Sequence, residues 1–372
     1  MKGLSVKRRM TRLFKLILTA ALMSGMLLAS GCGENSRPDS GGGDDASSGG
    51  DSAVTGERTT PLELKFGWQG SGREDDMTGY SCFAFMEYVE EKTNGMITFA
   101  QYPDGQLGNE NDMLDQVLTD NLDLSALSNN VLANIWPSFS AYNMPFAFSD
   151  YESFWKTTGV GSEFANALEK TVEDSGKAHF LSTFGATFRG CQNSKHALRS
   201  ADDFKGVTFR VMSGEIFTDF FRSLGASTAT VSFSELYTGL QQGVVDGEDT
   251  GVAMFCDQKF YEVEKYATEF NMCLSSNALV ISNGCWNQLT DAEKQIFRDA
   301  AKHAEEVNHQ TVVSTSDTYD ELLKSQGVEY IRHDDLTAEE IQSCIDATMP
   351  VWDKYKDTIG EDLYRILQEA RS

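Results

Sequence analysis

Apolar and polar side chains alternate in several short segments of the chain, and segments with helical spacing lie between them. Alternation with a period of two is the pattern of a β-strand with one buried face, whereas apolar residues three and four positions apart indicate a helix. The patterns predict strands over residues 62–68, 97–102, 122–127 and 179–184, with helices over residues 86–93 and 111–119. Because strands and helices alternate, we expect an α/β fold.

The alternation continues in the middle of the chain, where it includes an arginine. In residues 207–211 the valine and phenylalanine side chains share one face of a predicted strand, so Arg210 leaves the strand on the opposite face. A helix with phenylalanines at helical spacing follows, and it ends near Gly225, a residue type suited to a helix C-terminus.

A second helix and a further strand complete this segment. Ser232 and Glu235 form an S-x-x-E capping box, which predicts the start of a helix. Residues 244–245 predict a short buried strand that leads into the polar turn 246–250. We expect Arg210 and this turn to form two sides of a solute pocket.

Three further polar or aromatic residues stand at the carboxyl ends of predicted strands. In parallel sheets whose strands are joined by helices, ligands bind at this edge, which makes Trp68, Ser128 and Asn129 candidates for a crevice. Each also has a structural interpretation. Trp68 is on the apolar face of its own strand and could fill the core, and Ser128 and Asn129 could form a turn.

The first 31 residues have the pattern of an export signal. Six basic residues and no acidic residue accompany an apolar run from Leu16 to Leu28, which is too short to span a bilayer as a mature helix. Small residues then precede Cys32, in a sequence typical of a bacterial lipoprotein box. We therefore expect acyl chains on Cys32, which would attach the exported protein to the outer face of the cell membrane.

The chain after Cys32 predicts a flexible linker and a strongly acidic exported protein. Residues 33–60 are rich in Gly, Ser and Asp and contain almost nothing to bury. Removal of the six basic leader residues takes the net charge from -25 to -31. This charge excludes nucleic acid as a partner, and it means that an anionic ligand needs a local arginine.

The remaining six cysteines show no spacing typical of a metal site. There is no C-x-x-C, and the five histidines do not cluster with the cysteines, so we expect no metal and no cofactor. An even number of cysteines in an exported protein permits disulfides. Buried thiols are the preferred alternative, because a chain of this length can build its core without disulfides.

The C-terminal third contains a helical run from Asp291 to about Gln326, opened by Thr290 and Glu293 as a capping box. Its 36 residues would extend about 54 Å at 1.5 Å per residue, which exceeds the width of one lobe. The run therefore either breaks near Thr315 or runs along two lobes. Two further helices are predicted, one opened by a capping box at residues 337–340 and one over residues 361–371.

Several sequence motifs together resemble the solute-binding subunits of tripartite ATP-independent periplasmic (TRAP) transporters. The resemblance extends from about Leu62 to the C-terminus. It rests on the K-G-x-x-x-R strand ending at Arg210, the Leu-Gly-Ala corner 224–226, F-S-E-x-Y-x-x-L-Q at 233–241, V-D-G at 245–247, VEEKTNG at 89–95, QLG at 106–108, MPFAF at 144–148 and KFYEVEKY at 259–266.

This resemblance implies a two-lobed periplasmic-binding-protein-like fold with the ligand cleft between the lobes and a long helix spanning both. Its domain organisation would be a signal peptide at 1–31, a lipidated linker at 32–60, lobe I at 61–185 and 276–315, and lobe II at 186–275 and 316–372. The chain would cross between lobes near 185–186, near 275–276 and within the long helix.

The resemblance also implies the ligand-binding residues. Arg210 would bind a ligand carboxylate, and Arg189, 21 residues earlier, would be a second arginine of the site. Phe233 and Asp249 lie in the matching motifs. Relatives commonly have Gln-Glu-Asn where this chain has Glu-Asp-Thr, so Thr250 would replace an asparagine donor, or else would bind only its own loop.

The function implied is capture of a small organic carboxylate and its delivery to the small and large integral membrane subunits of a TRAP transporter. The alternative is a binding lipoprotein for an ATP-driven importer or a sensor kinase. An enzyme is disfavoured because the sequence has no G-x-S-x-G, H-E-x-x-H or paired-carboxylate signature. The solute itself is not identified by the sequence.

Overall fold

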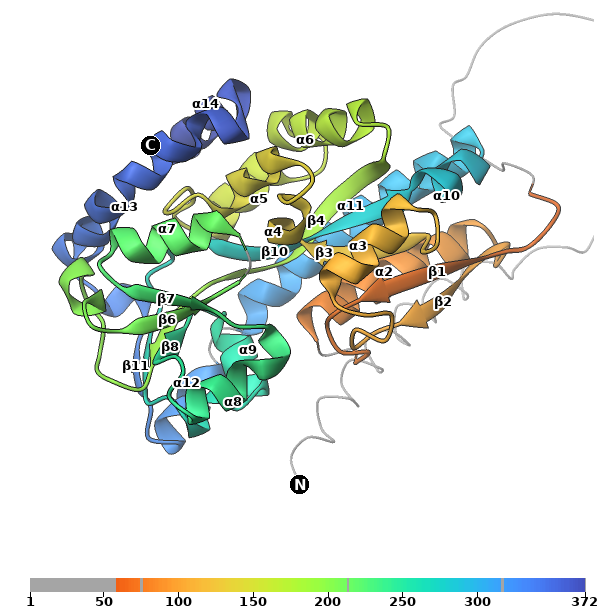
Figure 1. The fold of residues 1–372 in the computed structure, drawn as a ribbon. Coiled ribbons are helices and arrows are strands. Elements are labelled where there is room, and N and C mark those ends of the chain that lie inside the picture. Colours follow the sequence, from red (N-terminus) through yellow and green to blue (C-terminus); the bar gives the residue numbers. More distant parts are fainter. Residues whose placement is uncertain (1–57, 74–75, 213, 316–317, 372) are drawn as a thin grey trace, which may run out of the picture. The chain divides into compact units, whose positions relative to one another are not determined.

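A computed structural model describes residues 58–73, 76–212, 214–315 and 318–371 (Figure 1). The predicted signal peptide, the lipidation site Cys32 and nearly all of the linker lie outside the described residues. At the end of the linker, the guanidinium of Arg58 binds both carboxylate oxygens of Glu293, at 2.7 and 2.9 Å, and the carbonyl of Gln288. The chain is therefore held to the folded domain from Arg58 onward.

The first sheet is mixed, with strand order β2-β1-β3-β10-β4. Strands β1, β2 and β3 are parallel, whereas β10 is antiparallel to both β3 and β4. Their bounds are β1 Leu62–Trp68, β2 Ile97–Tyr102, β3 Leu124–Ser128, β4 Ala178–Phe188 and β10 Leu274–Ser282. The strands predicted at 62–68 and 97–102 are confirmed with the same bounds.

The second sheet has strand order β11-β9-β5-β8-β6-β7. Its strands are β5 Cys191–Asn193, β6 Thr208–Val211, β7 Ser227–Thr230, β8 Gly247–Glu248, β9 Tyr266–Thr268 and β11 Glu329–Ile331. The strand predicted at residues 244–245 was wrong in position, because the strand lies at Gly247–Glu248. Val244 is 57% exposed and only Val245 is buried, so pairing begins at Gly247, where β8 meets Gln192 and Asn193 of β5.

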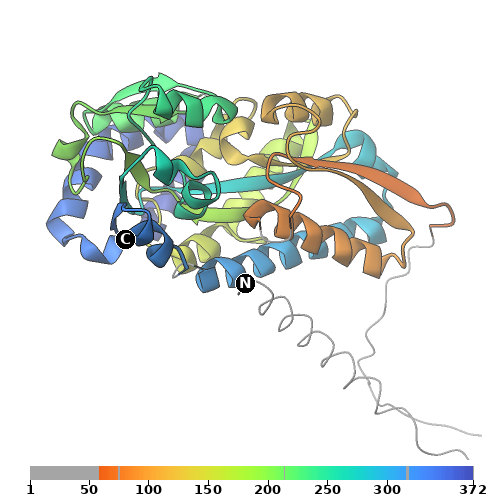
Figure 2. The ribbon, with the colours of Figure 1, turned by 90° about the horizontal axis from the view of Figure 1, so that it is seen from below.

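Several helices that accompany the first sheet begin at polar side-chain caps that satisfy free backbone N–H groups. Asp76 accepts from the N–H of Gly79 at the start of α2, and Asn109 forms a capping box with Asp112 at the start of α3. Figure 2 shows α11 alongside α2. The helices are α2 Met77–Lys92, α3 Glu110–Leu118, α4 Asn129–Leu132, α5 Tyr151–Thr158, α6 Glu163–Asp174, α10 Asn283–Gln288 and α11 Asp291–Thr315, with the 3₁₀ helix η1 Pro137–Asn143.

The remaining α-helices follow β6, and one of the remaining 3₁₀ helices precedes it. They are α7 Glu215–Ser223, α8 Leu236–Gln241, α9 Val252–Asp257, α12 Thr318–Ser325, α13 Ala338–Ile359 and α14 Glu361–Arg371, with 3₁₀ helices η2 Ala201–Phe204, η3 Phe233–Glu235, η4 Phe260–Glu262 and η5 His333–Asp335. The capping box predicted at Ser232 does not form. Its hydroxyl bonds to the Glu235 carboxylate at 2.6 Å, and the 3₁₀ turn η3 precedes α8.

The described residues of the predicted long helical run form two helices, α11 and α12. The capping box at Thr290 and Glu293 is confirmed by two reciprocal hydrogen bonds of 2.8 and 3.3 Å. Helix α11 ends at Thr315, the position at which a break was considered, and packs on α2 and β4. Helix α12 packs on α9 and β11, so the run passes from the first sheet to the second.

The chain passes between the two sheets at the ends of β4 and β10. Strand β4 extends beyond the predicted Phe184 to Phe188, because Ala186 and Phe188 continue the buried face. The passages therefore lie at residues 189–190 and 269–273, a few positions from the expected ones. Helix α14, expected with lobe II, packs on α13 and also on α5 and α6, and its Leu363, Ile366 and Leu367 enter the main apolar core.

Candidate functional site

Arg210 is a buried guanidinium whose terminal nitrogens have no hydrogen-bond partner among the described residues. The side chain leaves β6 and is 4% exposed. Its Nε donates to the carbonyl of Val231 at 2.9 Å, which fixes the direction of the planar group. Burial lowers the pKa of Arg210, although the charge of Asp249 opposes that shift. A buried cation with free donors is costly, so this geometry favours binding of an anion.

The ring of Phe233 lies beside this guanidinium. Its centroid is 6.0 Å from Cζ of Arg210, within the range of a cation–π contact. Phe233 begins η3 and also meets Phe260 edge to face at 6.2 Å. The structure thus brings Phe233 and Arg210 together, and their roles in ligand binding stay predictions.

Arg189 is occupied by Asp249. Its Nε and one terminal nitrogen donate to the two carboxylate oxygens at 2.9 and 2.8 Å, in a buried bidentate pair. The guanidinium also lies over the ring of Phe217, 5.1 Å from its centroid. Burial alone would lower the pKa of Arg189, but the attraction of Asp249 outweighs it and raises the pKa.

The hydroxyl of Thr250 is used within its own loop. The backbone N–H and the hydroxyl of Thr250 donate to the two oxygens of Glu248, at 2.6 and 3.0 Å. Burial, followed by the charge of Asp249, raises the pKa of Glu248 to about 7. This is the local role that was given as the alternative to ligand binding.

Asn129 reaches this region from the first sheet. It begins α4 directly after β3, and its amide nitrogen donates to the Ser276 hydroxyl at 2.6 Å. Its Oδ1 is buried and has no partner among the described residues. The preceding Ser128 donates its backbone N–H and hydroxyl to Glu110 at 2.7 and 3.2 Å. Burial raises the pKa of Glu110, and the positive charge of Arg210 opposes that shift.

Trp68 takes the structural alternative. It is fully buried in the core formed with Phe66, Phe85 and Leu279, and its indole N–H donates to the carbonyl of Ser71 at 3.3 Å. The apolar face of β1 determines this placement. The expectation that Trp68 donates to the ligand is therefore corrected, and Trp68 is a core residue.

Comparisons with known proteins agree with this geometry. The DctP family, bacterial extracellular solute-binding protein family 7, matches residues 72–358. The chain belongs to this family. It is 25% identical over 306 residues to the C4-dicarboxylate-binding protein DctB of Bacillus subtilis, covering 80% of this chain and 84% of that protein. It is 26% identical over 302 residues to the sialic acid-binding protein SiaP of Vibrio cholerae, covering 81% and 90%.

Solved structures of solute-binding proteins show the same two-lobed fold. A TRAP periplasmic solute-binding protein from Ochrobactrum anthropi has a TM-score of 0.75 and 27% identity, covering 84% of this chain and 96% of that chain. One from Polaromonas sp. JS666, bound to D-erythronate, has a TM-score of 0.74 and 26% identity, covering 82% and 98%. This family 7 protein is thus a binding protein, not an enzyme, and the TRAP interpretation is favoured over an ATP-driven importer.

Three polar residues close to the site were missed by the sequence analysis. Glu110 is the first residue of α3, Gln192 lies on β5, and Glu264 precedes β9. Oε1 of Gln192 and both carboxyl oxygens of Glu264 are buried without a partner among the described residues. Only Glu264 carried a local signal, since it stands in the KFYEVEKY motif, and no periodic pattern marks the other two.

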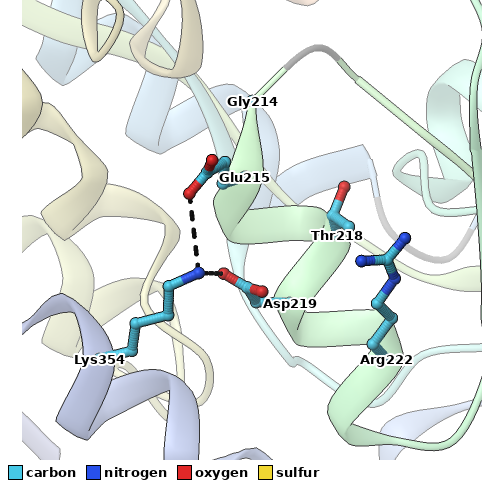
Figure 3. Close-up of a pocket in the computed structure, with 6 residues that line it drawn as sticks. All are labelled: Gly214, Glu215, Thr218, Asp219, Arg222 and Lys354. Carbon is cyan, nitrogen blue, oxygen red and sulfur yellow. Dashed lines mark hydrogen bonds and ion pairs between the residues drawn. The ribbon is translucent and has the colours of Figure 1, made fainter.

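A separate hollow of about 410 Å³ lies on the surface at α7 and α13, as Figure 3 shows. Lys354 of α13 contacts Asp219 at 2.5 Å and Glu215 at 3.6 Å, while Thr218 and Arg222 lie along another side of α7. The hollow contains none of the predicted ligand residues, and its Lys354 is already paired with Asp219 and Glu215. It therefore is not the candidate site.

The cysteine side chains and the groups that could hold a metal ion were two subjects of the sequence predictions. The six cysteines from Cys82 to Cys344 are buried free thiols. Within the described ranges, no cluster of His, Cys, Asp and Glu side chains is arranged to hold a metal ion. No helix among these residues has both the length and the apolar character needed to cross a membrane.

Proposed function

We propose that this family 7 protein captures a small organic carboxylate on Arg210 and delivers it to the small and large integral membrane subunits of a TRAP transporter. The observation that carries the proposal is the buried guanidinium of Arg210, whose terminal nitrogens are unpaired within the part of the chain that the structure describes. A carboxylate fits such a group because two parallel N–H···O bonds match its two oxygens. Relatives named as binding C4-dicarboxylates, sialic acid and D-erythronate support an acidic solute.

Native mass spectrometry of the protein purified from its host tests this proposal. The wild type should carry a co-purified carboxylate, and Arg210→Ala should carry none, because loss of a charge-assisted pair in a closed cleft costs about 3–5 kcal/mol. Arg222→Ala, which removes an exposed arginine of α7, should retain the solute. A folded Arg210→Ala protein with undiminished solute occupancy would contradict the proposal.

We also propose that acyl chains on Cys32 attach the protein to the outer face of the cell membrane. The support is the leader, with its apolar run and the small residues before Cys32. Intact-mass analysis of membrane-extracted protein should show the added diacylglyceryl and palmitoyl mass. Cys32→Ala should remain unmodified, and equal membrane retention of this variant would contradict an anchor at Cys32.

The division into lobes is the third part of the proposal. Lobe I would comprise residues 61–185 and 276–315 and lobe II residues 186–275 and 316–360, with α14 on lobe I. The contacts of α14 with α5 and α6 support the last assignment. A solute that meets Arg210 from β6 and Asn129 after β3 would contact both lobes.

A further inference from the structure

The two arginines of the site are not equivalent as anion receptors. Arg189 already has a full carboxylate partner, since Asp249 accepts from two of its nitrogens in a buried position. Among the described residues, the only hydrogen-bond partner of the Arg210 side chain is the neutral carbonyl of Val231, on Nε. If the proposed function holds, the site therefore offers one open guanidinium to the ligand, not two.

The acidic groups around Arg210 make a second ligand carboxylate unfavourable. The charges of Asp249, Glu248 and Glu110 all act on Arg210. A ligand with one carboxylate satisfies the open guanidinium. A ligand with two would bring its second charge close to these acidic side chains, and like charges at close range in a buried site repel strongly.

Two buried amide oxygens near the site lack partners among the described residues. Oδ1 of Asn129 and Oε1 of Gln192 have none among the described residues, and the amide nitrogens of both side chains are already used, toward Ser276 and the carbonyl of Thr250. Each of these oxygens needs a donor, which a ligand hydroxyl supplies and a carboxylate or a methylene does not.

We propose that the site selects a hydroxylated monocarboxylate over a dicarboxylate, and that Asp249 sets this preference by occupying Arg189. The carboxylate binds the terminal nitrogens of Arg210. A hydroxyl along the carbon chain donates to Oδ1 of Asn129. Asp249 is a specificity-determining residue that acts through Arg189.

The proposal is tested by calorimetry of the intact exported domain with two sets of acids matched in carbon number. The four-carbon set is D-erythronate, succinate and butyrate, and the six-carbon set is L-gulonate, adipate and hexanoate. In at least one set, the hydroxylated monocarboxylate should bind about tenfold or more tighter than both other acids, because a site with unpaired acceptors rejects an analogue that lacks the hydroxyl. Tighter binding of succinate or adipate overturns the proposal.

Calorimetry of an Asp249 variant tests the role of this residue directly. Asp249→Asn should leave Arg189 available and raise the affinity for the dicarboxylate of the set at least about tenfold relative to the hydroxylated acid, as expected for a freed charge-assisted partner. Asp202→Asn, which changes an exposed aspartate paired with Lys205, should leave the ratio unchanged. If the ratio of the two affinities is the same in folded Asp249→Asn as in the wild type, Asp249 does not set the preference. If this variant does not fold, the ratio measured with the wild type still decides which class of ligand the site prefers.

Failure of this inference and failure of the proposed function give different results. If dicarboxylates or unsubstituted acids bind best, the protein is still a carboxylate receptor and only the inference fails. If none of the six acids binds and native mass spectrometry finds no co-purified carboxylate, the proposed function fails, and the inference with it.

Discussion

The carboxyl group of Glu264 is completely buried beside that of Glu248, whose charge acts on it. Neither oxygen of Glu264 has a partner among the described residues, whereas Glu248 accepts two hydrogen bonds from Thr250. Burial is the main cause that raises the pKa of Glu264 from its ordinary value of 4.5, and the charge of Glu248 raises it further. The native protein therefore holds a proton on Glu264 at pH values at which the unfolded chain has lost it.

The wild type should lose stability as the pH rises above about 4.5. Glu264→Gln should not show this loss, because it has no carboxyl group to ionise. For an acid with a raised native pKa, the stabilising contribution is complete below about pH 4.5 and falls as the pH rises through the native pKa, by at most about 1.4 kcal/mol per pH unit. The melting temperature of Glu264→Gln should exceed that of the wild type more at pH 8 than at pH 5. Glu329→Gln, on the exposed edge of β11, should show no such difference, and parallel pH profiles for Glu264→Gln and wild type would contradict a protonated Glu264.

Thr250→Val should lower stability and leave ligand affinity within about twofold. The substitution keeps the shape of the side chain and removes a donor to the buried Glu248 carboxylate, which costs about 1–3 kcal/mol. Thr250→Ser retains the donor and should stay close to wild type. Denaturant unfolding and calorimetry measure the two quantities separately, and a fivefold or greater loss of affinity at unchanged stability would assign Thr250 to the ligand.

Ligand binding should close the two lobes. Arg210 extends from the second sheet and Asn129 follows a strand of the first, so a solute that contacts both favours the closed state. Small-angle scattering should give a smaller radius of gyration with the co-purified solute than after its removal. Arg210→Ala serves as the control that stays open, and identical wild-type profiles in both conditions would exclude a clamp.

The six cysteines from Cys82 to Cys344 should not react with a thiol reagent in the native protein. All are buried, and burial raises the pKa of Cys273 and Cys344 to about 12, so the reactive thiolate is scarce at neutral pH. Denaturation should expose six titratable thiols in a variant that lacks Cys32. Rapid labelling of the folded protein, or fewer than six thiols after denaturation without reductant, would disagree with this state.

Local patterns predicted the elements well where burial is regular. Alternation of apolar residues identified β1 and β2, and capping residues located the start of α11 at Thr290. They failed where tertiary contacts decide: Val244 is apolar but exposed, and the Ser232 hydroxyl prefers the Glu235 side chain to the backbone.

For the candidate site too, local motifs identified some residues, and the pairings that depend on tertiary contacts were missed. Arg210 and Phe233 were found through motifs, and the structure places them together. The pairing of Arg189 with Asp249 could not be predicted, because it joins positions 60 residues apart and depends on how β5, which follows Arg189, pairs with β8. Trp68 had two interpretations with the same local pattern, and only the packing around it distinguishes them.

The position of β10 affects how the newly exported chain reaches its native state. This strand lies between β3 and β4 in the first sheet, although almost the whole second sheet precedes it in the sequence. An N-terminal fragment that ends before Leu274 lacks the partner that joins β3 to β4, so the first sheet is completed only after residues 274–282 have crossed the membrane. We therefore expect slow folding dominated by distant contacts, with a period in which emerging polypeptide relies on chaperones outside the cytoplasm.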